Sequence, residues 1–99
     1  MLGFQAEVFG AEALVTAPVG SVLPGRTTEL EVIAWDSGQP LVSPLIKVDS
    51  TKGAVLGFRP GAEQGLYRLT YRGPEEGGVS DALSFRFANG SQAQGTVEI

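Results

Sequence analysis

The sequence predicts an all-β fold, an antiparallel immunoglobulin-like β-sandwich of about seven short strands. No window of a dozen residues places apolar side chains at the i, i+3, i+4 and i+7 spacing of an amphipathic helix. Instead, short runs of alternating or β-rich composition are separated by turn residues, and the chain holds 14 glycines and 6 prolines. Its 99 residues are enough for one hydrophobic core and too few for two. We therefore expect a single domain spanning residues 1–99.

The first two strands are expected at residues 12–17 and 28–36. The first ends at Pro18, and the pair Val22-Leu23 is expected to continue it as a broken edge strand, because proline is tolerated at a sheet edge. The second is the longest run. It is closed by Asp36-Ser37-Gly38-Gln39-Pro40, a stretch rich in turn-forming residues.

Three further strands are expected at residues 45–49, 54–58 and 66–72. In the first of these, Ile46 and Val48 share one face by strand alternation. In the third, the side chains of Tyr67, Leu69 and Tyr71 project to one side and those of Leu66, Arg68, Thr70 and Arg72 to the other. The aromatic side is expected to face the core.

The last two strands are expected at residues 82–87 and 94–99. Between them lies Asn89-Gly90, the dipeptide that most readily adopts two positive φ angles in a tight hairpin turn. These two strands are therefore expected to pair antiparallel. Asn89-Gly90-Ser91 also fits an N-glycosylation acceptor pattern, but the hairpin explains these residues more simply.

Two of these segments carry a family resemblance. Asp36-Ser37-Gly38-Gln39-Pro40 and the strand Gly65-Leu66-Tyr67-Arg68-Leu69-Thr70-Tyr71, followed by Gly73-Pro74, resemble the bacterial immunoglobulin-like modules of invasin-type and intimin-type surface proteins. The match covers residues 12–99; the first turn is one residue shorter than usual, and the loop at 73–78 is longer. Filamin-type repeats and other sandwich modules share the tyrosine-bearing strand. The resemblance implies an immunoglobulin-like sandwich in a cell-surface or secreted setting, with spacer or adhesive duty.

Composition excludes several classes of partner. Seven basic and eleven acidic residues give a net charge of −4, which offers no electrostatic footprint for nucleic acid or anionic lipid. No apolar run approaches the roughly 20 residues needed to span a bilayer, so membrane insertion is not expected. The first residues lack the basic and hydrophobic regions of a signal peptide. Because residues 95–99 end within a strand pattern, we expect a module excised from a longer multidomain chain.

The sequence contains few candidate catalytic residues. The chain has no histidine and no cysteine. This excludes the commonest acid-base group, the Ser–His and Cys–His nucleophile pairs, and the usual zinc ligands. Ser50 with Lys52 is the remaining nucleophile-base pair, and a solvated turn explains it better. Glu29 and Glu31 share one strand face, where they are expected to form a polar outer surface. We therefore predict a protein that is not an enzyme and has no cofactor.

Calcium is an alternative use for the acidic residues. Several carboxylates fall at the ends of expected strands, where oxygen ligands from loops can gather around this ion. They are Asp36, Asp49, Glu75, Glu76 and Asp81. No Asp-x-Asp-x-Asp spacing is present, so turn capping is the preferred interpretation and no metal site is assigned.

Trp35 and Ile33 are the candidate contact residues. If Leu30, Val32 and Ala34 face inward, the side chains of Trp35 and Ile33 share the outer face, where tryptophan can stack on a sugar or pack against a neighbouring domain. In the opposite register they belong to the core. The preferred function is a non-enzymatic module whose partners are neighbouring domains or another protein. The alternative is an accessory carbohydrate-binding module attached to an enzyme.

Overall fold

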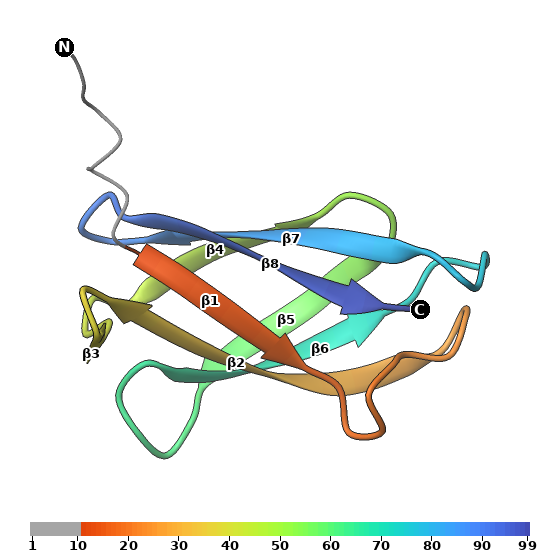
Figure 1. Cartoon of the computed structure of the whole chain (residues 1–99), viewed down its shortest axis with the longest axis horizontal. Helices are drawn as coiled ribbons and strands as arrows, with labels where there is room; N and C mark the ends of the chain where they lie inside the picture. Colours follow the sequence, from red (N-terminus) through yellow and green to blue (C-terminus); the bar gives the residue numbers. More distant parts are fainter. Residues whose placement is uncertain (1–10) are drawn as a thin grey trace, which may run out of the picture.

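The computed structural model describes residues 11–99, which form two antiparallel β-sheets packed face to face (Figure 1). None of these residues is helical. The all-β sandwich predicted from the sequence is therefore confirmed. The strands are β1 (Ala11–Thr16), β2 (Thr27–Asp36), β3 (Gln39–Pro40), β4 (Leu45–Ser50), β5 (Ala54–Pro60), β6 (Leu66–Arg72), β7 (Ser80–Phe87) and β8 (Gln92–Glu98). The sequence-based expectation that the chain begins without a signal peptide concerns residues 1–10, which lie outside the described residues.

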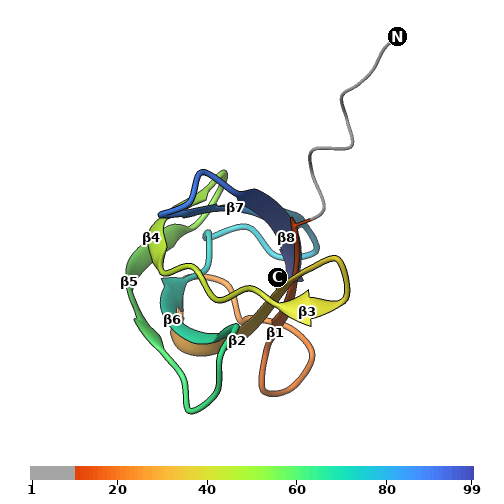
Figure 2. The same ribbon diagram turned by 90° about the vertical axis from the view of Figure 1, so that its left-hand side faces the viewer.

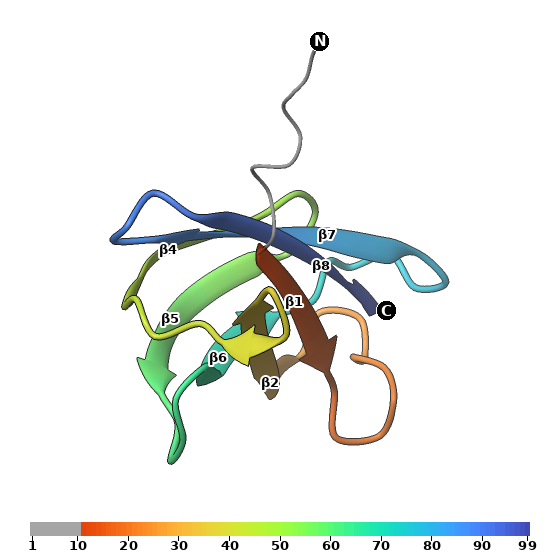
Figure 3. The ribbon, with the colours of Figure 1, turned by 60° about the vertical axis from the view of Figure 1, so that its left-hand side comes forward.

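One sheet has the strand order β1-β2-β6-β5, with the short β3 paired to the end of β2, and the other has the order β4-β7-β8. Figure 3 shows the two layers, with β7 and β8 above β2 and β6. The end-on view shows β1 beside β8 on one side of the sandwich and β4 beside β5 on the other (Figure 2). At the first of these edges the strands pack closely: a Cβ atom added at Gly95 would lie 2.8 Å from Cγ2 of Val15. Both edges of the sandwich are thus partly covered by strands of the opposite sheet.

The core forms from alternate residues of the central strands. In β2, Leu30, Val32 and Ala34 are fully buried. In β6 the buried residues are Tyr67, Leu69 and Tyr71, as predicted from the alternation of that strand. The rings of Tyr67 and Phe87 meet across the two sheets with their centroids 6.2 Å apart and their planes tilted by 59°. The aromatic side of β6 thus joins the two sheets.

The first loop differs from its prediction. Val22 and Leu23 do not continue the first strand; they lie in the connection between β1 and β2. The chain turns there at Gly20 and Gly25, both with positive φ, which breaks any regular strand pairing. Val22 is nevertheless buried, and its backbone N–H donates to the carbonyl oxygen of Glu98 at 2.8 Å. The apolar side chain of Val22 thus packs a loop against the core and does not belong to a strand.

The prediction that Ile46 and Val48 share one face of their strand is also wrong. A bulge between Leu45 and Lys47 shifts the pairing of β4 with β7, so alternation is interrupted there. Leu45 is buried and Val48 packs against the core, whereas Ile46 is 54% exposed. Because of the extra residue at the bulge, Leu45 and Val48 face the core and Ile46 faces solvent.

The hairpin between β7 and β8 is confirmed as antiparallel, but its turn is not the predicted one. Gly90 has φ of 91°, whereas Asn89 does not have a positive φ. The Phe87 N–H donates to the Ser91 carbonyl, and the Gly90 N–H donates to the Phe87 carbonyl, both at 2.9 Å. This is a three-residue loop that closes with glycine in the left-handed region. Two consecutive positive φ angles occur instead at Ser37 and Gly38, between β2 and β3.

Candidate functional site

Trp35 and Ile33 lie on the outer face of β2. Their register follows from the burial of Leu30, Val32 and Ala34, which point into the core. Ile33 is 46% exposed, and Trp35 is half-buried. Of the two registers considered from the sequence, the structure has the one that places both candidate contact residues on the outside of the sandwich.

An apolar patch extends from Ile33 across three neighbouring strands. Ile33 is directly opposite Leu14 of β1 and Leu66 of β6. Leu14 is 54% exposed, and Leu66 is half-buried. With Trp35, these residues are called the apolar patch below. Apolar side chains that gather on one exposed face are characteristic of interaction sites.

Beside the apolar patch lies a hollow of about 420 Å³, called the tryptophan hollow. Ile33, Trp35 and Leu66 line it from the two strands, Gly38 and Pro40 from the β2–β3 hairpin, and residues 63–65 from the loop before β6. The hollow therefore combines an indole ring with the polar side chains of Glu63 and Gln64.

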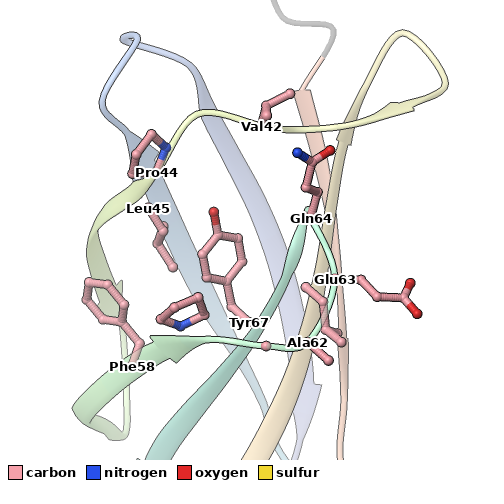
Figure 4. Close-up of a pocket in the computed structure, with 12 residues that line it drawn as sticks. Val42, Pro44, Leu45, Phe58, Ala62, Glu63, Gln64 and Tyr67 are labelled. Carbon is pink, nitrogen blue, oxygen red and sulfur yellow. The ribbon is translucent and has the colours of Figure 1, made fainter.

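A second hollow, of about 500 Å³, lies between the two sheets near the β4 and β5 edge and is called the phenylalanine hollow (Figure 4). Its apolar lining includes Phe58, Tyr67, Leu45 and Pro44, which come from both sheets and the loop before β4. Phe58 is 37% exposed. The Tyr67 hydroxyl is engaged, since it donates to the carbonyl oxygen of Ser43 at 3.3 Å.

The loop between β5 and β6 contributes to both hollows, because residues 63–66 line each of them. It is held by backbone hydrogen bonds: the Gly61 N–H donates to the Leu66 carbonyl at 2.7 Å, and the Gly65 carbonyl accepts from the Ala34 N–H at 2.7 Å. Gly65 has φ of 79°, and a Cβ atom there would lie 2.6 Å from the Ala34 carbonyl oxygen. Only glycine fits this close approach, so the wall between the hollows depends on Gly65.

Glu29 and Glu31 form ion pairs on the outer face of β2, where Glu31 lies two residues before Ile33 of the apolar patch. Glu29 lies 2.8 Å from the Arg59 guanidinium and 3.8 Å from that of Arg68, which also lies 3.3 Å from Glu31. The hydrogen bond from Arg59 lowers the pKa of the Glu29 carboxyl and outweighs an opposing effect of burial, and the charges of both arginines lower it further. These carboxylates form the polar outer surface predicted for them.

A buried polar cluster centres on Asp81, at the end of the sandwich opposite the two hollows. This carboxylate is fully buried and accepts a hydrogen bond from the Tyr71 hydroxyl. It also accepts from three consecutive backbone N–H groups of the β4–β5 loop, those of Thr51 at 3.1 Å and of Lys52 and Gly53 at 2.8 Å. Burial alone would raise the pKa of Asp81, but these hydrogen bonds outweigh it and the pKa is lowered.

Ser50 and Lys52, the candidate nucleophile and base from the sequence, lie at the β4–β5 loop that surrounds Asp81. Lys52 contributes its backbone N–H to Asp81, while the Ser50 hydroxyl donates to the Gly53 carbonyl. Within residues 11–99 no group of three or more acidic residues could hold a metal ion. Asp81 in particular is occupied by protein donors. Its burial could have been found from the sequence, because Asp81 is in phase with the alternating core residues Leu83 and Phe85 of the same strand.

No protein-family model, curated protein or solved structure matches this chain. Within the described part of the chain, no helix is long and apolar enough to cross a membrane.

Proposed function

We propose that this chain is a non-enzymatic immunoglobulin-like module of a bacterial surface or secreted protein, which serves as a rigid spacer or as an adhesive or assembly interface. The order β1-β2-β6-β5 in one sheet and β4-β7-β8 in the other supports this class. Apart from the short β3, the numbers of strands are those of the constant-type immunoglobulin arrangement, which has a four-stranded and a three-stranded sheet.

The observation that carries the interface role is the apolar patch. Leu14 and Ile33 are directly opposed on neighbouring strands and both remain about half exposed, at 54% and 46%. A partner that covered them would remove apolar surface from water, at about 25 cal/mol per Å². The ion pairs of Glu29 and Glu31 beside them would supply a polar rim.

The spacer role is supported by the path of the chain. In Figure 1, β1 begins toward the end that carries β3, and Ile99 lies toward the opposite end. Modules connected in this way would follow one another along the long axis. The cluster around Asp81 also ties the β4–β5 loop to β6 and β7, which favours a rigid unit.

Surface location can be tested on intact cells. An antibody against the module should label unpermeabilised cells of the source bacterium or detect the protein in the medium. Labelling that requires permeabilisation would contradict the surface or secreted setting. For the spacer role, the full-length gene should encode several similar segments in tandem, and a lone copy fused to a catalytic domain would contradict it.

A carbohydrate-binding module is the second candidate, and Trp35 favours it. The half-buried indole lines the tryptophan hollow together with Gln64 and Glu63, which can donate to and accept from sugar hydroxyls. Binding on a glycan array should then disappear in Trp35→Ala while the circular dichroism spectrum is retained. Absence of glycan binding by the unmodified chain would exclude this candidate.

A further inference from the structure

We propose that the tryptophan hollow and the phenylalanine hollow together bind one extended peptide segment, whose two apolar side chains flank a lysine or arginine. This inference rests on the proposed interface function and names the partner. The two hollows adjoin, because residues 63–66 line both. An extended ligand that crosses this loop can therefore place one side chain on each side of it.

The hollows suit apolar anchors. Phe58, Tyr67 and Leu45 surround the phenylalanine hollow, and Trp35 and Ile33 line the tryptophan hollow. Aromatic walls of this kind take up apolar side chains with a large buried area per residue. The Tyr67 hydroxyl is already used by the Ser43 carbonyl, so Glu63 and Gln64 supply the free polar side chains of the phenylalanine hollow.

Charge selects the residue between the anchors. Glu63 is exposed and lines both hollows, and among residues 11–99 it is the one charged residue that lines either of them. A second acid, the exposed Glu12, is directly opposite Trp35 on the neighbouring strand β1. A cationic side chain placed over the loop would be attracted by these carboxylates, whereas an anionic ligand would be repelled.

The wall between the hollows is already formed in the free chain. The hydrogen bonds of Gly61 and Gly65 fix the loop, and the Leu66 N–H closes it further by donating to the Glu63 carbonyl at 3.1 Å. A site that is ordered before binding avoids the entropic cost of ordering a loop. The loop therefore presents Glu63 and Gln64 at a defined position between the two anchors.

Selection of random peptides displayed on phage, with the 99-residue chain immobilised, tests this inference. Enriched peptides should share two apolar residues with a lysine or arginine between them, at positions that an extended segment turns to the same face. A synthetic peptide of the consensus sequence should then perturb the backbone amide resonances of Gln64, Gly65 and Leu66. Failure to enrich any peptide, enrichment of acidic peptides, or binding of oligosaccharides alone would overturn the proposal. The surface-labelling experiment is independent of these results, so the module function can stand when the peptide site fails.

Matched variants locate the site. Glu63→Gln should weaken the consensus peptide about 2- to 5-fold and remove the preference for a basic residue, since an exposed charge pair is lost. Glu76→Gln, which removes an exposed carboxylate from the distant β6–β7 loop, should change neither. Phe58→Ala and Trp35→Ala should each weaken binding about 10-fold through loss of an apolar wall. Equal effects of Glu63→Gln and Glu76→Gln would contradict the proposed position.

Discussion

The hydroxyl of Tyr71 donates a hydrogen bond to the buried carboxylate of Asp81. Tyr71 belongs to β6 in one sheet and Asp81 to β7 in the other, so this bond joins the two layers through the core. Three backbone N–H groups of the β4–β5 loop also donate to the carboxylate. The cluster thus connects both sheets and one loop at a single ionised side chain.

Tyr71→Phe should destabilise the fold by about 1 to 3 kcal/mol, because it removes a donor from a buried acceptor while the ring remains in place. The free energy of unfolding in urea measures the effect. Tyr67→Phe is the matched control: its hydroxyl bonds at 3.3 Å to a backbone carbonyl in a partly buried setting, so a smaller loss is expected. Equal losses in the two variants would show that the bond to Asp81 has no special contribution.

Stability should fall in acid because of Asp81. Its pKa in the folded state lies below the unfolded value of about 3.9, so the carboxylate contributes stability above that pH and loses it as the pH falls through the folded pKa. Urea unfolding at a series of pH values below neutrality should show this loss. In Asp81→Asn the chain should be less stable at neutral pH and its stability should depend less on pH in the acid range. An unchanged pH profile in the variant would assign the acid sensitivity to other carboxylates.

Gly65→Ala should destabilise the chain by about 1 to 3 kcal/mol, because alanine disfavours a positive φ and its methyl group would meet the Ala34 carbonyl. Gly57→Ala, in the neighbouring strand β5, is the control: nothing lies within 4 Å of a Cβ atom there. Thermal unfolding of both variants checks the difference. Comparable stabilities would mean that the loop relaxes without cost.

Leu69→Ala should lower the free energy of unfolding by about 2 to 5 kcal/mol, because it removes a fully buried side chain of β6 and leaves a cavity in the core. Arg68→Ala, one position earlier, should cost under about 1 kcal/mol, since its ion pairs with Glu31 and Glu29 are exposed to solvent. Chemical denaturation of the two variants distinguishes the faces of the strand. Similar losses would contradict the observed register.

The prediction of β6 from the sequence was accurate because the buried side of a strand repeats every two residues and the burial in this strand alternates without interruption. The same reasoning was wrong for Ile46, where a bulge interrupts the alternation of β4. It placed Trp35 and Ile33 together on one face but left two registers open. Only the packing of Leu30, Val32 and Ala34 against the other sheet selects between them.

The all-β class, the alternation of the central strands and the presence of turns could be predicted from the sequence, because these features depend on neighbouring residues along the chain. Tertiary structure alone decided the partners of Asp81 and the meeting of Phe58, Tyr67 and Trp35 around the loop that carries Glu63. Those relationships join strands that are distant in the sequence, and they depend on which strands pair and which edges of the two sheets come together.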